Sequence, residues 1–175
     1  AVLGATPLFV LDYLAASQFT LEELRALLAG VTAACREEGV ALVGGETAQM
    51  PGVYTAEGLD VVACVVGVVE RDGVTDGSRI RAGDVLIALA AGGLHTNGFS
   101  LARKIMARRH WTLETAPEGL GMPLGQALLT PHRSYRRPLS ALAKAGWLSG
   151  AAHITGGVIA ANLLRILPEG RRARV

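Results

Sequence analysis

The sequence is poor in the residues that would indicate a membrane protein or a disulfide scaffold. Of its 175 residues, 18% are charged, 5% are aromatic and two are cysteines. Cys35 and Cys64 lie far apart with no histidine near them, which indicates neither a zinc motif nor a disulfide framework and favours buried thiols in a reducing cytoplasm. The longest apolar run, residues 61–69, is interrupted by Gly67 and is shorter than the roughly 18 residues that a membrane helix needs.

Several common functional motifs are also missing. There is no Gly-x-Ser-x-Gly and no Cys–His pairing, so nothing indicates a covalent nucleophile. The sequence has neither a Walker-type Gly-Lys-Ser/Thr nor a dinucleotide Gly-x-Gly-x-x-Gly, which argues against the two commonest nucleotide-binding folds. A formal net charge of +2, with no aromatic residues among the basic pairs, gives no reason to expect nucleic acid as a partner.

Apolar residues, by contrast, are in surplus. Half of the sequence is hydrophobic, and its 18% of charged residues is below the average of about 25% for soluble proteins. Residues 60–70 form a valine-rich run without alternation, which predicts a strand covered on both faces. We therefore expect a large subunit interface and a homodimer, because this surface would otherwise be exposed to water.

The first half of the chain predicts a strand, a helix and a second strand. Residues 7–13 are strand-like, and residues 40–43 predict a short buried strand. Between them, Thr20 and Glu23 form a capping-box pattern at the start of a helix, and Gly39 is placed to end it.

Turn residues over 72–77 predict a boundary between an N-terminal domain, residues 1–74, and a C-terminal domain, residues 75–175. Beyond it, the apolar residues 84–90 predict another strand. Three helices are predicted further on, from Asn97 or Ser100 to about Arg109, from Pro131 to about Ala145, and from Gly157 to Pro168, with residues 112–122 as a loop. Strands alternating with helices predict an α/β or α+β arrangement.

The segment GGETAQMPG, residues 44–52, is the most informative part of the chain. Gly44 and Gly45 allow a sharp turn and a close approach to a ligand, because neither carries a Cβ. Glu46 is suited to holding a metal ion and Thr47 to binding a phosphate oxygen. From the residues alone, a glycine-containing turn with exposed polar side chains is an equal alternative.

Two further clusters of polar residues follow the same logic. His95, Asn97 and Ser100 stand where a predicted strand gives way to a helix, and helix N-termini favour anions. A second cluster precedes the last predicted helix and comprises His153, Thr155, Gly156 and Gly157. The alternative for both is a capping cluster with an exposed histidine. Asp12 is either a metal or nucleotide ligand or a structural acceptor for backbone amides.

These motifs carry a resemblance to a known family. The segments PLFVLDY (7–13), GGETAQMPG (44–52), GLHTNGFSL (93–101) and AHITGG (152–157) occur in the order and with roughly the spacing of phosphoribosylformylglycinamidine cyclo-ligases, also called aminoimidazole ribonucleotide synthetases. The resemblance covers essentially the whole chain. It implies two domains: the later part of an N-terminal sheet domain that pairs across a dimer, and the earlier part of a C-terminal α/β domain.

The resemblance also implies an activity, which is ATP-dependent ring closure of formylglycinamidine ribonucleotide with Mg²⁺. On this basis His95 and Glu46 are expected to be catalytic, and Asp12 and Glu46 to bind the metal. The remaining assignments are Asp12, Gly44, Gly45 and Thr47 for nucleotide, and Asn97, Ser100, His153, Thr155, Gly156 and Gly157 for substrate. Since family members are roughly twice as long, we expect the chain to be incomplete and inactive by itself.

The sequence departs from the family pattern at a few positions. Gln49 replaces a glutamate, Ala91 and Gly92 stand where serines are common, Val158 replaces a third glycine and Ala161 an acid. These departures motivate one alternative, a non-catalytic dimer-forming relative. Another ATP-using member of the superfamily, of the selenophosphate synthetase or thiamin-monophosphate kinase type, is a second alternative.

Overall fold

The computed structural model describes residues 1–175, and its chain divides into two compact units. One is Ala5–Asp72, and the other combines Ala1–Gly4 with Gly73–Val175. Each unit is considered by itself below. No helix in either is both long enough and apolar enough to cross a bilayer.

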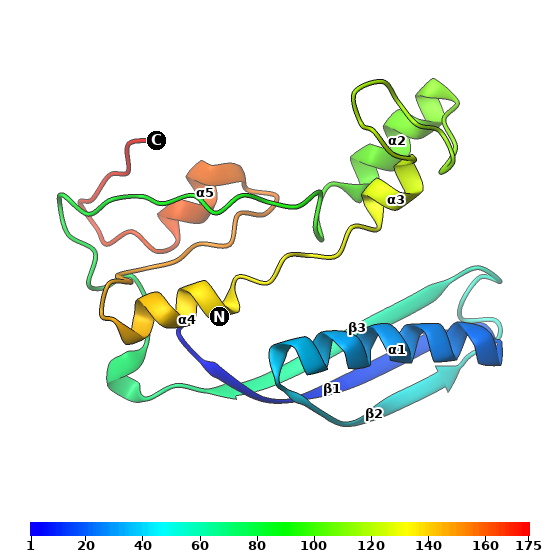
Figure 1. The fold of residues 1–175 in the computed structure, drawn as a ribbon, viewed down its shortest axis with the longest axis horizontal. Coiled ribbons are helices and arrows are strands. Elements are labelled where there is room, and N and C mark those ends of the chain that lie inside the picture. The colour runs from blue at the N-terminus through cyan, green and yellow to red at the C-terminus, as the bar shows by residue number, and fades with distance from the viewer. The chain divides into compact units, whose positions relative to one another are not determined.

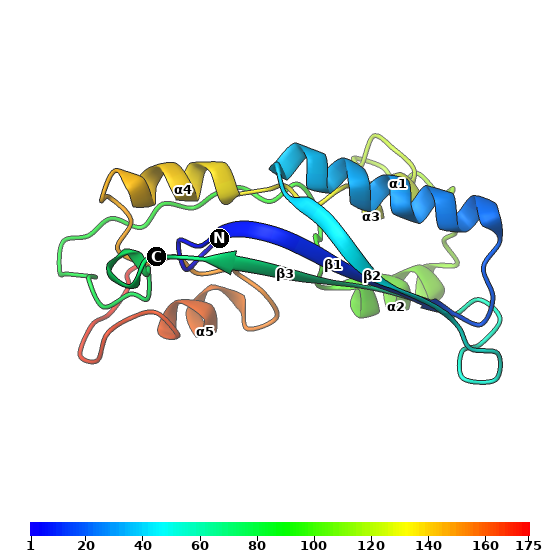
Figure 2. The same ribbon diagram turned by 90° about the horizontal axis from the view of Figure 1, so that it is seen from below.

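The unit Ala5–Asp72 is a three-stranded sheet with one helix (Figures 1 and 2). Its elements in chain order are β1 (Thr6–Ala16), α1 (Leu21–Glu38), β2 (Ala41–Gln49) and β3 (Leu59–Val68). The strand order is β2-β1-β3, with β1 parallel to β2 and antiparallel to β3. Since parallel neighbours need a crossover, α1 connects β1 to β2 and lies along one face of the sheet, as Figure 2 shows.

The capping residues predicted for α1 are confirmed. The backbone N–H of Glu23 donates to Thr20 Oγ1 at 3.2 Å, and the N–H of Thr20 donates to the Glu23 carboxylate at 2.8 Å. The bonds from Thr20 hold the pKa of Glu23 below its ordinary value, because they favour the charged carboxylate. At the other end, Gly39 ends the helix in the left-handed conformation with φ of 63°.

The core of this unit lies along β1. Val10, Leu14, Ala15 and Ala16 are at most 5% exposed, and Cys35 of α1 is also buried, as predicted. The prediction for Cys64 is wrong, because its thiol is exposed. Cys64 pairs with Leu11 of β1, which is itself 39% exposed.

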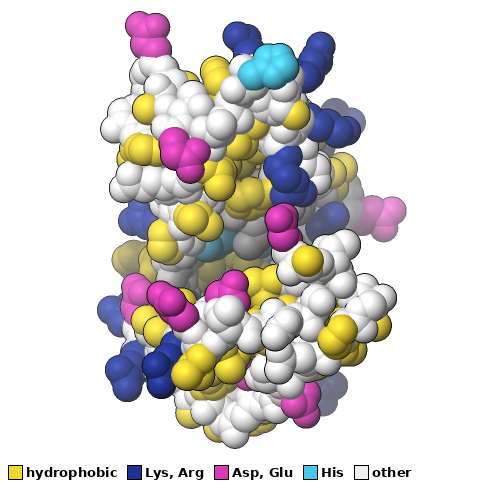
Figure 3. All heavy atoms as spheres, turned by 90° about the vertical axis from the view of Figure 1, so that its right-hand side faces the viewer, with side chains coloured by type: hydrophobic (Ala, Val, Ile, Leu, Met, Phe, Trp, Pro, Cys, Tyr) yellow, Lys and Arg dark blue, Asp and Glu magenta, His cyan; other side chains and the backbone are white.

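The valine-rich strand β3 is exposed within this chain, which contradicts the expectation that both its faces are covered. Val61, Val62, Val65 and Val68 are 47–59% exposed. One helix is too narrow to cover a whole face of the sheet, and no element of this unit packs on the other face. Hydrophobic side chains are visible at several places on the surface shown in Figure 3.

The second unit contains no strand. Its elements are a 3-10 turn (η1, Arg71–Gly73, which straddles the division), α2 (Phe99–Arg109), α3 (Leu124–Leu128), α4 (Arg136–Lys144) and α5 (Val158–Leu164). The strand predicted over residues 84–90 is therefore absent, and Val85 and Ile87 are 84% and 75% exposed. A strand needs a partner for its backbone N–H and C=O groups, and this unit offers none.

The three predicted helices of this unit are present: α2 ends at Arg109 as predicted, whereas α4 and α5 are shorter than expected. The helix expected from Pro131 begins at Arg136, because local bonds compete with the helical ones: His132 Nδ1 donates to Arg133 O, and Ser134 Oγ accepts from the Arg136 N–H. The last helix ends at Leu164, short of Pro168. Residues 112–122 are irregular as predicted, and α3 was not predicted.

Candidate functional site

The glycine segment lies on β2, which continues to Gln49, so the sharp turn predicted at Gly44 and Gly45 after a strand over 40–43 is wrong. Pairing with β1 keeps these residues extended, and the pairing register shifts just before them. Val10 pairs with Leu42, whereas Leu11 pairs with Gly44. Val43 is therefore an extra residue on β2, which is a β-bulge. A bulge bends the strand locally, so the sequence Gly44-Gly45 follows a change in strand direction.

Gly45 is opposite Asp12 in the parallel pair. A Cβ added to Gly45 would collide with both the carbonyl oxygen and a carboxylate oxygen of Asp12. Gly44 differs, since its added Cβ would meet only the end of the Leu11 side chain at 3.9 Å. The close approach of Asp12 to β2 thus requires glycine at position 45.

An open cavity of about 550 Å³ lies at this place. Its lining includes every residue predicted for nucleotide and metal in the first half of the chain, namely Asp12, Gly44, Gly45, Glu46 and Thr47. Leu28 of α1 contributes an apolar wall. The structure therefore brings these five residues together around one hollow.

The two carboxylates at the cavity do not fit a shared metal ion. Asp12 pairs with Gly45 and Tyr13 with Glu46, so side-chain alternation directs Asp12 and Glu46 to opposite faces of the sheet. Glu46 Oε1 accepts from the N–H of Thr47 at 2.9 Å. No group of three or more His, Cys, Asp or Glu side chains in the chain is placed to hold a metal.

Gln49, which stands near the end of β2 where the family pattern has a glutamate, makes a structural hydrogen bond. The Gln49 Oε1 accepts from the N–H of Phe19 at 2.9 Å. A carboxylate oxygen can accept the same bond, so this contact places no demand on a charged group at position 49.

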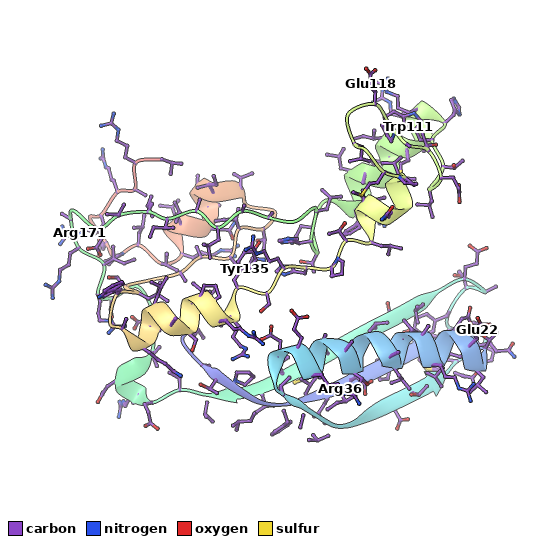
Figure 4. All side chains as sticks on the ribbon, in the orientation of Figure 1. Glu22, Arg36, Trp111, Glu118, Tyr135 and Arg171 are labelled. Atoms are coloured by element: carbon purple, nitrogen blue, oxygen red, sulfur yellow. The ribbon has the colours of Figure 1, made fainter.

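The second set of predicted residues lies in the unit Gly73–Val175, where three histidines gather. The ring centroids of His95 and His132 are 3.9 Å apart, and those of His132 and His153 are 5.6 Å apart. Tyr135 completes the cluster, with its ring 6.1 Å from that of His95 and 5.8 Å from that of His132. Figure 4 labels Tyr135 just before α4.

His95 is held in an unusual backbone conformation with φ of 54°. Its Nε2 accepts from the N–H of Gly92 at 2.9 Å, so the ring closes a short turn back onto the chain. Burial lowers the pKa of His95 below its ordinary value, and charge on His132 and His153 lowers it further. His95 is therefore poised as a neutral imidazole.

His132 and Tyr135 were not predicted from the sequence. The Tyr135 hydroxyl donates to the backbone carbonyl of Ala90 at 2.9 Å, which ties the start of α4 to the segment before His95. No local pattern around His132 indicates a site. One indirect signal was available: the sequence has four histidines, and two of them, His95 and His153, already belonged to predicted clusters.

The predicted caps of α2 are wrong. The N-cap is Gly98, with φ of 91° and no side-chain hydrogen bond, because the chain enters this helix through a left-handed turn. Asn97 Nδ2 donates to Thr96 Oγ1 at 3.2 Å, and Ser100 is exposed on the first turn. No hydrogen bond joins Asn97 or Ser100 to the histidines, whereas the His132 ring contacts those of both His95 and His153.

The residues after His153 serve the start of α5. Thr155 Oγ1 donates to Asn162 Oδ1 at 3.2 Å, and Asn162 Nδ2 donates to the carbonyl of Val158 at 2.7 Å. Asn162 is 2% exposed, so this bonded pair fixes the turn that Gly156 and Gly157 enter. Gly157 is the N-cap of α5, and a Cβ on it would lie 2.9 Å from Ala161 Cβ.

The replacement of the third glycine by Val158 has a structural cost. Val158 has φ of 50°, a left-handed conformation that β-branched residues rarely adopt. A glycine would adopt it without strain. The position therefore retains the backbone conformation suited to glycine although the side chain has changed.

Fold and candidate sites together define a two-domain α+β protein with polar strand ends and a histidine cluster. The chain belongs to the AIR synthase related protein family: the model of that family's N-terminal domain matches residues 1–69, and the model of its C-terminal domain matches residues 81–175.

Curated relatives agree with this family. The chain is 48% identical over 170 residues to a phosphoribosylformylglycinamidine cyclo-ligase of Shouchella clausii, covering 97% of this chain and 49% of the relative. It is 45% identical over 173 residues to the cyclo-ligase of Bacillus subtilis, covering 98% of this chain and 50% of that one. The chain thus spans about half the length of the curated relatives it matches.

A solved structure is also similar. The thiamine monophosphate kinase of Aquifex aeolicus aligns with a TM-score of 0.47 and 21% sequence identity, covering 82% of this chain and 43% of that chain.

Proposed function

We propose that the protein containing this chain closes the imidazole ring of purine biosynthesis, converting formylglycinamidine ribonucleotide and ATP to aminoimidazole ribonucleotide, ADP and phosphate. The observation that carries the proposal is the 45–48% identity, across 97–98% of the chain, to relatives named as cyclo-ligases. The four motifs of the sequence lie within the matched domains.

The chemistry needs anion-binding groups more than it needs a nucleophile. In the proposed reaction ATP activates a formyl amide oxygen, and an amidine nitrogen of the same substrate attacks the activated carbon. Such a site has to hold phosphate groups and keep the substrate curled, while donors stabilise the developing charge. The histidine cluster offers ring N–H donors for this purpose, and the cavity at β2 offers a glycine-lined hollow.

For the cavity, we propose a nucleotide role. Asp12, Gly44, Gly45 and Thr47 are the proposed nucleotide contacts, supported by their common place in its lining. Glu46 is proposed as a charged contact to the reacting groups at the same edge. The opposite faces of Asp12 and Glu46 do not support a Mg²⁺ ion held by both, so no step of the reaction is assigned to a metal.

For the second unit, we propose a substrate role. His95 is the proposed catalytic residue, supported by its neutral state and its contact with the other histidines. The proposed substrate contacts are Asn97, Ser100, His153, Thr155, Gly156 and Gly157. The Thr155 hydroxyl already donates to Asn162, so Thr155 can donate to the substrate only if that hydrogen bond is broken.

We further propose a homodimer formed through the sheet of the first unit. Val61, Val62, Val65 and Val68 leave apolar area exposed along β3, and burying it would contribute about 25 cal/mol per Å². A cytoplasmic location follows as a prediction from the unpaired cysteines. Sedimentation of the full-length protein at micromolar concentration tests the oligomer, and a stable monomer contradicts it.

The enzyme assignment is tested by a coupled assay of ADP release with the full-length protein, including any sequence that flanks residues 1–175. Turnover that depends on formylglycinamidine ribonucleotide supports the proposal. The strain at Val158 and the loss of glycine there favour the second candidate, a non-catalytic relative that kept the scaffold. A folded full-length protein without substrate-dependent turnover selects that candidate.

A further inference from the structure

The histidines of this chain are unevenly distributed. Three of the four gather in one cluster, and the fourth, His110, ends α2 as its C-cap. The cluster draws on three separate segments of the unit Gly73–Val175, since His95, His132 and His153 are far apart in sequence. The fold therefore creates a concentration of imidazole that no single motif encodes.

The hydrogen bonds of this cluster define the state of each ring. Nε2 of His95 accepts from the N–H of Gly92, so this nitrogen carries a lone pair and the ring is neutral. In His132, Nδ1 lies 2.8 Å from the carbonyl oxygen of Arg133, which can only accept, so Nδ1 carries the proton. That bond occupies Nδ1 of His132 and leaves its Nε2 for another partner.

Protonation changes what this cluster presents. A proton on Nε2 of His95 would turn the acceptor into a donor that faces the donor N–H of Gly92, 2.9 Å away. Two facing donors cannot bond to one another, and both then need an acceptor. An oxyanion supplies acceptors of this kind, and it also offsets the charge that accumulates on neighbouring imidazoles.

The surroundings of the cluster contain no built-in counter-charge for His95. The titratable side chains that face His95 are His132, His153 and Tyr135, and none of them is a carboxylate. The pKa of His95 is lowered by burial and by the two histidines, and no negative charge acts against this shift. The Tyr135 hydroxyl is engaged with Ala90 O, so it positions the segments and does not neutralise charge. An external anion would therefore stabilise the protonated cluster.

We propose that His95, His132 and His153 form a proton-linked receptor for a tetrahedral dianion such as the phosphate group of a nucleotide, with His132 as a direct binding residue. The identity of that phosphate as one carried by the ribonucleotide or ATP rests on the proposed function. On binding, a proton from solvent enters Nε2 of His95 and a second enters Nε2 of His132, so that both nitrogens and the N–H of Gly92 donate to the anion. No covalent bond forms or breaks.

The same side chains do not form a metal centre. No three potential ligands in the chain are placed around a common point, and the rings of His95 and His132 contact each other with their centroids 3.9 Å apart and their planes tilted by 40°. An anion, which accepts N–H bonds from several directions, is the ligand that this arrangement fits.

Sulfate is the appropriate probe, because its charge stays constant over the pH range in which histidine titrates. Titration calorimetry on the full-length protein, with a metal chelator present, should show tighter sulfate binding at about pH 6 than at about pH 8, by up to about tenfold per pH unit for each linked proton. The imidazole C–H signals of the three clustered histidines should shift with sulfate, and that of His110 should not.

The variants isolate the residue that is new. His132→Asn should lower sulfate affinity at about pH 6 roughly tenfold and flatten its pH dependence. His110→Asn is the matched control and should leave both unchanged, because His110 has φ of 55°, which asparagine tolerates. Affinity that is independent of pH, or equal effects of the two variants, overturns the proposal.

The outcome is separable from that of the proposed function. If sulfate binding is proton-linked but the full-length protein does not close the ring, the receptor proposal is supported. Its assignment to the phosphate of the ribonucleotide is then contradicted. If ring closure is normal but sulfate binding depends neither on pH nor on His132, the receptor proposal is contradicted and the proposed enzymatic function is supported.

Discussion

Gly45 lies directly against the carboxylate and the carbonyl of Asp12, across the parallel pair formed by β1 and β2. The contact leaves no room for a side chain at position 45, whereas Gly44 has space. It links the glycine segment to the opening strand and explains why both of these sequence motifs line one cavity.

Gly45→Ala is expected to destabilise the unit Ala5–Asp72 by about 1–3 kcal/mol, because the new Cβ forces β1 and β2 apart at Asp12. Gly44→Ala is the matched control and should change stability by about 0.5 kcal/mol or less, since its Cβ meets only the Leu11 side chain. Urea unfolding of the 175-residue chain and of both variants measures the difference. Equal losses in the two variants would show that the close approach at Asp12 is not what constrains this glycine.

Val158→Gly is expected to stabilise the chain by about 1 kcal/mol, because glycine adopts the left-handed backbone of this position without the penalty that Val158 bears. Ile159→Gly, one residue further along α5, is the control and should destabilise by about 1 kcal/mol, since a helical position gains nothing from glycine. Thermal unfolding of both variants provides the comparison. A loss in Val158→Gly as large as that in Ile159→Gly counts against strain at this position.

How far the sequence predicts the structure depends on whether a feature is local. The capping box of Thr20 and Glu23 and the stop at Gly39 are set by neighbours in the chain, so α1 is predicted almost to the residue. Residues 84–90 have the composition of a strand, but a strand requires a partner elsewhere, and this unit supplies none. Composition alone cannot reveal whether that partner exists.

The same distinction applies to the candidate sites. The residues at the β2 cavity were predicted because paired glycines followed by a carboxylate are recognisable locally, and the structure brings them together although β2 continues through them to Gln49. Sequence spacing did not reveal that Asp12 and Glu46 face opposite sides, because the bulge at Val43 and the pairing register decide this. His132 and Tyr135 were missed because folding alone places them beside His95.

The pKa of His95 predicts how stability depends on pH. Burial and the neighbouring histidines lower this pKa below the ordinary value of about 6.5, so the unfolded chain binds a proton more readily than the folded one. The contribution of neutral His95 to stability is therefore fully present above about pH 6.5 and is lost as the pH falls through the lowered pKa.

His95→Asn should accordingly reduce the loss of thermal stability between about pH 7 and about pH 5, because asparagine tolerates φ of 54° and does not titrate. His110→Asn serves as the control, since His110 lies outside the cluster and its removal should preserve the acid sensitivity of the parent chain. Melting temperatures of the three proteins over this pH range decide the matter. An unchanged pH profile in His95→Asn contradicts the role assigned to its titration.

Glu46→Gln tests the proposed site at β2 in the full-length protein. The substitution keeps the shape of the side chain and an oxygen that can accept from the Thr47 N–H, but it removes the charge. If Glu46 contacts the reacting groups, turnover should fall by about 10²–10³, as is typical for the loss of one preorganised electrostatic contact. The melting temperature should change little, because Glu46 is exposed.

Glu57→Gln is the matched control, since Glu57 is an exposed carboxylate in the turn before β3 and lies outside the cavity lining. It should keep both turnover and stability. If residues 44–47 have only a structural role in β2, the reverse is expected for Glu46→Gln: normal turnover with a modest change in melting temperature. Measuring ADP release and thermal unfolding on the same two full-length variants separates the two, and normal turnover in Glu46→Gln would remove the catalytic assignment of Glu46 even if the protein closes the ring.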